Sequence, residues 1–137
     1  GIEELCGVLE RTKMDTYYPD LLDKATHLLI GINKGHFFGN GNKRLALVAM
    51  TTFLTLNSHC LAGHGKEKYQ SLLARLFLEH THWQDYAEFE GTDFATYNLS
   101  IIIADSGAYG IKHDDLKERV KEFLVSSVVD VRNDQAG

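Results

Sequence analysis

A single proline in 137 residues is the feature that most constrains the fold of this chain. Proline interrupts helices, and after Pro19 the apolar residues recur at helical spacing through long stretches without such a break. A fold with many turns would carry more proline and more turn signals. We therefore expect a compact all-α domain whose helices are joined by short connections.

About six stretches carry the helical pattern, and most place their apolar side chains on one face. Asp20 is a candidate N-cap of the second helix, Gly35 is placed to end that helix, and Asp114 or Asp115 is a candidate cap of the last. The third helix is apolar on almost every side, which is typical of a buried, central helix. The six stretches are residues 2–14, 20–34, 42–57, 66–80, 92–106 and 113–128.

The length of the chain fits one domain, residues 1–137, with enough residues to bury a core. Gly1 opens almost directly onto a helical pattern, so we expect further N-terminal residues before it. A net charge of −5 argues against direct nucleic-acid binding. No apolar run of about 18 residues predicts a membrane span, and no leader is recognisable, so the cytoplasm is the expected compartment.

The stretch "GHFFGNGNKRLAL", residues 35–47, lies between two helical patterns and carries the chemistry of an anion site. Gly39 and Gly41 permit turns in which successive backbone N–H groups point at one position and form a nest for an anion. The loop then enters a helix N-terminus, where the dipole favours a phosphate. Lys43 and Arg44 add positive charge, and arginine can bind two phosphate oxygens at once.

His36 lies at the other end of the same loop. Its ordinary pKa class suits the removal of a proton from a hydroxyl near neutral pH. A base, an anion nest and cations are together what phosphoryl or nucleotidyl transfer requires. The loop is not a Walker loop, because Asn42 precedes the lysine where glycine is needed and Arg44 follows it where serine or threonine is needed.

This stretch resembles the signature of the Fic/Doc (Fido) family, H-x-F-x-[acidic]-G-N-x-R. The resemblance extends over about residues 18–57 and is closest to the Doc, or death-on-curing, toxin branch. The positions that carry it are His36, Phe38, Gly41, Asn42 and Arg44.

The resemblance implies a helical Fido fold and the transfer of a group from ATP to a hydroxyl of a target protein. His36 would correspond to the general base, and Phe38 would anchor the loop in the core. Arg44 would hold a terminal phosphate. The phosphates of ATP would bind to Gly39, Asn40, Gly41, Asn42, Lys43 and Arg44.

Lys43 bears on which group is transferred. Members of the family that transfer AMP usually have glycine at this position, whereas lysine resembles the Doc branch, which is associated with phosphate transfer and with toxin–antitoxin pairs. The resemblance therefore implies a kinase-like toxin whose partners are a target protein, such as a translation factor, and an antitoxin protein. AMP transfer on the same fold is the alternative.

Asn40 departs from the family pattern, which has an acidic residue here to hold Mg²⁺. A neutral amide oxygen is a weaker ligand for a hard dication than a carboxylate. Asn40 would still orient a metal that the phosphates of ATP hold, with ATP and Mg²⁺ as the cofactors. A further alternative is a nucleotide-binding module weakened by the loss of this carboxylate.

Histidines and cysteines outside the loop have simpler interpretations. His59, Cys60 and His64 form an incomplete set of zinc ligands, so we interpret them as loop histidines and a buried free thiol. We expect His80 and His82 to lie on the surface near a helix end.

Three aromatic residues, Trp83, Tyr86 and Phe89, follow in the same region. A packing role in the domain is favoured over a binding platform.

Overall fold

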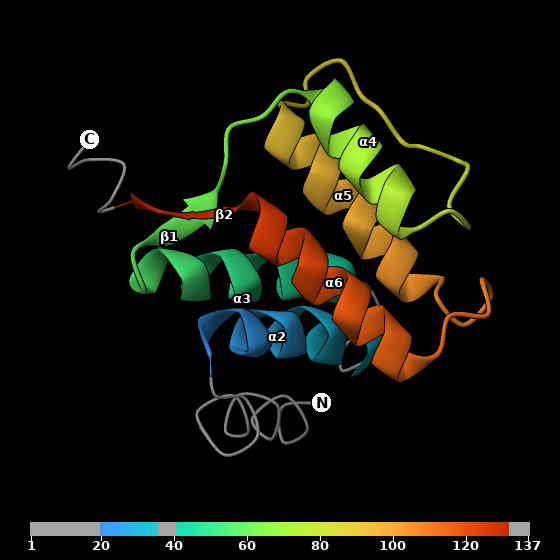
Figure 1. The fold of residues 1–137 in the computed structure, drawn as a ribbon, viewed down its shortest axis with the longest axis horizontal. Coiled ribbons are helices and arrows are strands. Elements are labelled where there is room, and N and C mark those ends of the chain that lie inside the picture. Colours follow the sequence, from blue (N-terminus) through green and yellow to red (C-terminus); the bar gives the residue numbers. More distant parts are fainter. Residues whose placement is uncertain (1–19, 36–40, 132–137) are drawn as a thin grey trace. The chain divides into compact units, whose positions relative to one another are not determined.

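The computed structural model describes residues 20–35 and 41–131, which form five α-helices and two short β-strands (Figure 1). The all-α prediction is confirmed for this part of the chain. The helix expected over residues 2–14 lies outside the described residues. The elements are α2 (Leu21–Gly35), α3 (Asn42–Leu56), β1 (His59–Leu61), α4 (Lys66–Leu76), α5 (Gly91–Ala104), α6 (His113–Ser127) and β2 (Val128–Asp130).

The chain divides into two compact units. The first contains residues 1–60 and 129–137, and the second contains residues 61–128. Helices α2 and α3 belong to the first unit, and α4, α5 and α6 belong to the second. The single domain expected from the length of the chain stays a prediction.

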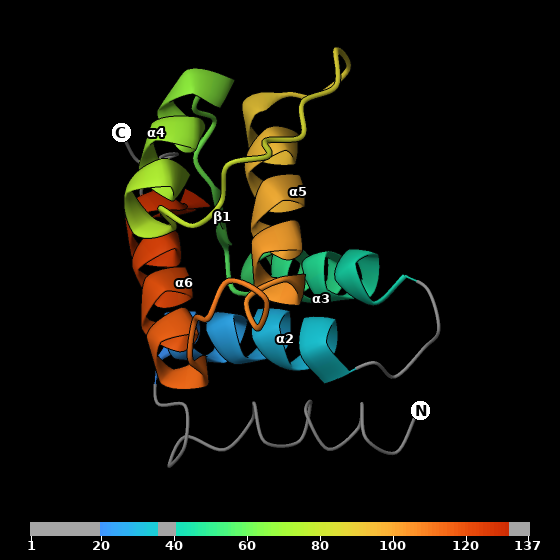
Figure 2. The same ribbon diagram turned by 90° about the vertical axis from the view of Figure 1, so that its right-hand side faces the viewer.

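The first unit is built on a pair of helices. α2 and α3 pack against each other and run in opposite directions, as both views show (Figure 2). α2 starts where the sequence predicts, because the carboxylate of Asp20 accepts a hydrogen bond of 2.7 Å from the N–H of Asp23 and caps the first turn. The apolar side chains that α2 buries are Ala25, Leu28, Leu29, Ile30 and Ile32.

α3 is less enclosed than its sequence indicates. Its buried side chains are Ala46, Met50 and Leu54, which lie four residues apart and form one narrow stripe. Val48 is 55% exposed and Leu56 is 79% exposed. The prediction of a helix buried on all sides is therefore wrong for α3, which is buried on one face. Apolar residues all around a helix do not ensure that other elements pack against every side of it.

In the second unit, α4 and α5 lie side by side and begin at the same end of the pair. The connection of residues 77–90 carries the chain back along α4, so that the first residue of α5 meets the backbone before α4. A Cβ added to Gly91 would lie 1.8 Å from the carbonyl oxygen of His64, which no side chain permits. Glycine at the start of α5 thus allows this close approach of α5 to the chain that precedes α4.

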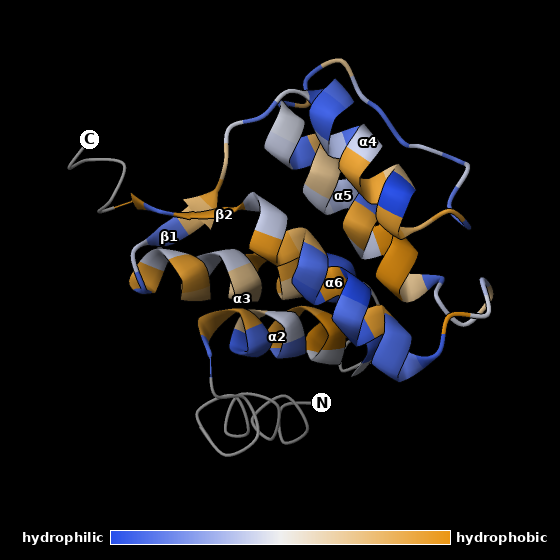
Figure 3. Cartoon of the chain, in the orientation of Figure 1, coloured by the Kyte–Doolittle hydropathy of each residue, from blue (hydrophilic) through white to orange (hydrophobic). Residues whose placement is uncertain are grey.

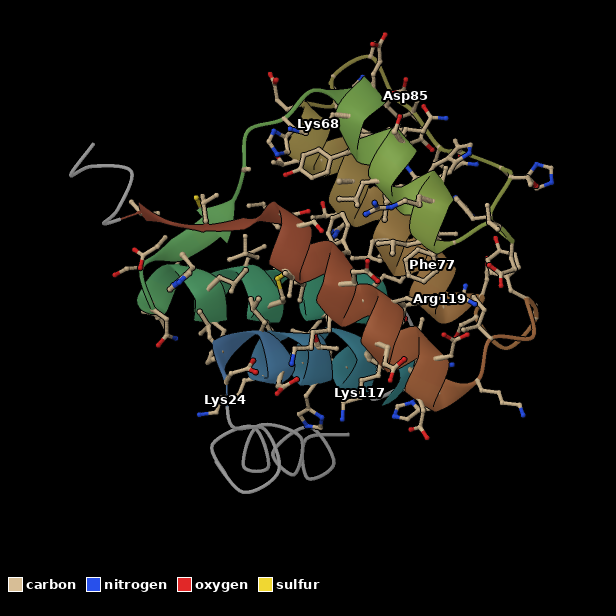
Figure 4. All side chains as sticks on the ribbon, viewed as in Figure 1. Lys24, Lys68, Phe77, Asp85, Lys117 and Arg119 are labelled. Carbon is tan, nitrogen blue, oxygen red and sulfur yellow. The ribbon has the colours of Figure 1, made fainter. Side chains whose placement is uncertain are left out.

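α6 is joined to the end of α4 by one arginine (Figure 4). The guanidinium of Arg119 donates to both carboxylate oxygens of Glu79, at 2.9 and 3.1 Å, and to the carbonyl oxygen of Leu76 at 3.2 Å. It also binds the carboxylate of Asp115 one turn earlier on α6 and lies 5.8 Å from the centre of the Phe77 ring. Blue and orange segments alternate along α4 and α6, as expected for helices with one buried face (Figure 3).

The start of α6 differs from the sequence prediction. Lys112 occupies the N-cap position and makes no side-chain capping bond, while Asp114 and Asp115 lie inside the first turn. The prediction that one of these aspartates is the cap is wrong by two or three residues. Both carboxylates still lie where the helix dipole favours negative charge.

The two strands were not expected, because three residues are too short for an alternating pattern to stand out. β1 and β2 pair in an antiparallel sheet, with the N–H of Val131 bonded to the carbonyl of Ser58 and that of Ala62 bonded to the carbonyl of Ser127. His59 lies 3.9 Å from the carboxylate of Asp130 across this pairing. The region predicted as a loop after α3 is therefore partly a sheet.

Candidate functional site: the N-terminus of α3

The expected site straddles the edge of the described structure. Gly41, Asn42, Lys43 and Arg44 belong to the start of α3 and are described. His36, Phe38, Gly39 and Asn40 fall in residues 36–40, outside the described residues, so the roles expected for them stay predictions.

Gly41 has a backbone conformation that explains why the residue is glycine. Its φ of 88° and ψ of 6° place it in the left-handed region, which an L-residue with a side chain enters only at a cost. Gly41 is the N-cap residue of α3, and its carbonyl accepts the first helical hydrogen bond, 2.9 Å from the N–H of Leu45. The turn predicted for this glycine is thus present at the entry to the helix.

The first turn of α3 carries positive charge where a helix ordinarily prefers negative charge. Lys43 and Arg44 are exposed there, and the turn contains no acidic residue. The other four described helices each have aspartate or glutamate in the first turn. Two cations beside the positive end of a helix dipole are unfavourable by a few tenths of a kcal/mol or more, unless an anion binds there.

Within residues 20–35 and 41–131, no side chain makes a capping hydrogen bond at the N-terminus of α3. A helix offers no internal acceptor to the N–H groups of its first turn, which therefore point outward beside the two cations. Backbone N–H groups, a lysine and an arginine together suit a phosphate group. The described part of the loop offers no carboxylate, so a divalent cation would depend on phosphate oxygens and on Asn40.

The expected surface position of His80 is wrong. α4 ends at Leu76, and the chain then turns inward, so that His80 is only 3% exposed. Its Nδ1 lies 2.9 Å from the hydroxyl of Tyr109, and its Nε2 lies 3.2 Å from the amide oxygen of Asn98. Burial raises the pKa of Tyr109, with the negative charge of Asp105 adding to this effect. Nothing local in the sequence marks this contact, because its partners are 18 and 29 residues away.

Asn98 holds the connection before α5 to that helix. Its amide nitrogen donates to the carbonyls of Gln84 and Phe94, at 2.8 and 2.9 Å, and its oxygen accepts from the N–H of Gln84 at 3.0 Å. Together with His80, this buried amide joins the connection to α5. The cluster is a structural clamp, and His82 beside it is exposed, as predicted.

The residues around the short sheet form no metal site. The described residues contain no group of three histidine, cysteine or acidic side chains able to hold a metal ion. Cys60 is exposed, which corrects the expectation of a buried thiol, because it is the middle residue of a three-residue strand whose other two side chains are the ones partly buried. Cys6 lies outside the described residues.

The comparisons with known proteins bear on the first part of the chain. The model of the Fic/DOC family matches residues 3–54. This match contains α2, the loop and nearly all of α3, and it supports a Fic/Doc relationship for less than half of the chain. No curated protein and no solved structure matches the chain. Among the described residues, no helix is both long and apolar enough to cross a membrane.

Proposed function

We propose that this protein is a Fic/Doc-type transferase that moves a phosphate from ATP to a hydroxyl of a target protein. The observation that carries the proposal is the entry to α3, where left-handed Gly41 is followed by exposed Lys43 and Arg44 inside the segment that matches the family. Backbone N–H groups and two cations at one helix end suit the phosphates of a nucleotide. A family whose members transfer nucleotide-derived groups to proteins supports the same chemistry.

In this proposal His36 takes the proton from the attacking hydroxyl, and Phe38 anchors the loop. Arg44 binds a terminal phosphate through two parallel hydrogen bonds, and Lys43 adds a mobile positive charge. Gly39 and Gly41 keep the backbone close to the phosphates. Mg²⁺ would be held by the phosphates of ATP and oriented by Asn40, and its charge would stabilise the charge that develops during transfer.

The choice between phosphate and AMP rests on Lys43. Its side chain stands in the first turn of α3, where it occupies space that glycine would leave open. We expect it to make ATP bind with the terminal phosphate toward His36. AMP transfer is the second candidate, and it predicts that the phosphate next to the adenosine lies there instead.

Label transfer separates the candidates. The protein is incubated with purified translation factors and with ATP labelled on either the terminal or the innermost phosphate. Label from the terminal phosphate alone supports phosphate transfer, and label from the innermost phosphate supports AMP transfer. The variant His36→Ala is the control, because it removes the base without altering the helix entry; labelling by this variant at the wild-type rate contradicts the role of His36.

Absence of both labels, with ATP still bound, supports the nucleotide-binding module. Asn40→Asp then tests the reason, because a carboxylate restores the charge that fixes Mg²⁺. In an active enzyme we expect this variant to raise the rate most at low magnesium and little at saturating magnesium. Without the metal, the new negative charge repels the phosphates, so ATP affinity falls. If neither quantity changes, Asn40 does not face the metal.

The toxin role is part of the same proposal. An antitoxin protein would bind this domain and block transfer, and cytoplasmic translation factors would be the targets. Growth arrest on expression of the wild-type chain, but not of His36→Ala, is the outcome that supports it.

A further inference from the structure

Three aromatic rings gather on the outside of the second unit. Tyr86 is 44% exposed and Tyr97 is 37% exposed, and Phe89 is half-buried between them. The ring of Tyr86 lies edge-on to those of Phe89 and Tyr97, with centres 5.1 and 5.9 Å apart, and the Phe89 and Tyr97 centres are 5.4 Å apart. Trp83, which precedes them, is a packing residue, since it stacks on Phe94 with ring centres 6.0 Å apart.

The sequence around these rings is acidic, and the cation beside them, Lys66 of α4, is paired with Asp85. Between Arg75 and Lys112 the sequence contains no lysine and no arginine. Asp85 and Glu88 flank Tyr86, and both are exposed. The pKa of Tyr86 is raised mainly by its side-chain hydrogen bond and its electrostatic interaction with Tyr97. Burial and the negative charge of Glu88 raise it to a smaller extent. Glu88 is exposed and directly precedes Phe89, so it lies on the same short segment as two of the rings.

The segment that carries these rings is held in place by contacts with α4 and with the start of α5. The ammonium of Lys66 forms an ion pair of 2.8 Å with Asp85 and donates a hydrogen bond of 3.0 Å to the carbonyl of Tyr86 (Asp85 is labelled in Figure 4). A capping box between Glu90 and Asp93 fixes the start of α5, one turn before Tyr97. The surface is thus ordered before any ligand arrives, which lowers the entropic cost of binding.

We propose that the Tyr86 surface, defined as Tyr86, Phe89 and Tyr97 with Glu88, docks a basic segment of a partner protein. A guanidinium attracts the faces of aromatic rings and pairs with carboxylates, so arginine fits both components of this surface. Exposed rings also bury apolar side chains that lie between the basic residues. The acidic sequence around the rings disfavours nucleic acid and anionic lipid as occupants. The proposal is independent of the chemistry at α3.

The probe is a short fluorescent peptide of alternating arginine and leucine, and the comparison peptide has glutamine in place of arginine. Binding is measured by fluorescence anisotropy at low and at high salt. We expect the arginine peptide to bind more tightly, with an affinity that falls as salt rises. Equal affinity of the two peptides would show that charge complementarity does not operate and would overturn the proposal.

Variants locate the binding. Tyr86→Ala combined with Tyr97→Ala should lower the affinity by about fivefold or more, and Glu88→Gln by about twofold. Two matched controls, Leu78→Ala and Glu118→Gln, remove an exposed apolar side chain and an exposed carboxylate elsewhere in the second unit, and should leave binding unchanged.

Glu88→Gln keeps the test decisive if the double tyrosine variant does not fold, because an exposed carboxylate is not needed for folding. An equal loss in Glu88→Gln and Glu118→Gln would mean diffuse attraction to an acidic protein, and would overturn the proposal. So would a wild-type dimer that the tyrosine variant converts to a monomer in sedimentation, because the occupant would then be a second copy of the chain.

Discussion

Any residue that replaced Gly41 would have to keep a backbone φ of 88°. This requirement separates Gly41 from most other glycines of the described structure. Gly63, for example, has no such constraint and open space around its Cα. The sequence predicts a special turn at Gly41 from its place before a helix. It also predicts the cationic first turn, because Lys43 and Arg44 follow at the expected start of the helix. It does not predict that no described side chain caps this turn, because that depends on how α3 begins in space.

Gly41→Ala should lower the free energy of unfolding by about 1–2 kcal/mol, the cost of a side chain in the left-handed region. ATP affinity should fall as well, because the entry to α3 shifts. Urea unfolding and calorimetry measure the two effects. The control Gly63→Ala has no left-handed φ and should change neither; a loss of stability as large as that of Gly41→Ala would contradict this explanation.

Lys43 and Arg44 are both exposed, so replacing either one should leave stability nearly unchanged. Arg44→Ala should weaken ATP binding by about tenfold or more, because a bidentate charged contact is lost, and Lys43→Ala should weaken it by less. Titration calorimetry with ATP measures both affinities. Wild-type affinity in Arg44→Ala would exclude a phosphate contact by this residue.

Gly91→Ala tests the close approach at the start of α5. The added Cβ would lie 1.8 Å from the His64 carbonyl oxygen, so the backbone must move, at a cost of about 3 kcal/mol or more. Thermal unfolding should show a large drop in the midpoint, and Gly107→Ala, where a Cβ meets nothing, should show little. Equal midpoints for the two variants would mean that α5 does not approach His64 in solution.

At the scale of the elements, the helices were predictable and the contacts between distant segments were not. α2 and α6 follow from local periodicity, which needs only neighbouring residues. The stretch of α5 is ambiguous, because its run of isoleucines could be a strand, and its length and flanking caps favour the helix that is observed. α4 ends earlier than predicted, at Leu76, because the connection that follows is held by Asn98 and Arg119 from other helices. Such partners lie far away in the sequence, and no local pattern announces them.

The Arg119 contact makes the second unit sensitive to acid. The hydrogen bond from Arg119 holds the pKa of the Glu79 carboxyl below its ordinary value. The contribution of Glu79 to stability is therefore fully present above about pH 4.5 and is lost as the pH falls through the lower, folded-state value. Glu79→Gln should have a flatter dependence of the unfolding free energy on pH in this acidic range. Urea unfolding at several pH values measures it, with Glu118→Gln as the control; the same slope in Glu79→Gln and wild type would contradict it.

At the scale of the whole molecule, the border between the two units falls within both short strands. β1 begins in the first unit and ends in the second, and β2 begins in the second and ends in the first. Unfolding of either unit would remove part of both strands. The prediction of one domain from the length of the chain is compatible with this connectivity, although the division into two units was not predictable from composition.

Calorimetry tests the cooperation of the units. We expect one thermal transition in which the calorimetric and van't Hoff enthalpies agree, because the border between the units falls inside both strands. Asp130→Asn should lower the midpoint without splitting the transition, since it weakens the pairing of His59 with β2. Two resolved transitions in the wild-type protein would show that the units unfold separately.

The long stretch without lysine or arginine also decides how this protein is best studied by mass spectrometry. Trypsin cuts after those residues alone, so Leu76 to Lys112 leaves as one fragment that carries all three rings of the Tyr86 surface. Lysine-directed cross-linkers find no lysine in this fragment before Lys112, and the neighbouring Lys66 is engaged by Asp85. Reagents that couple carboxylates to amines would instead join Glu88 to a lysine of a basic partner and report the contact directly.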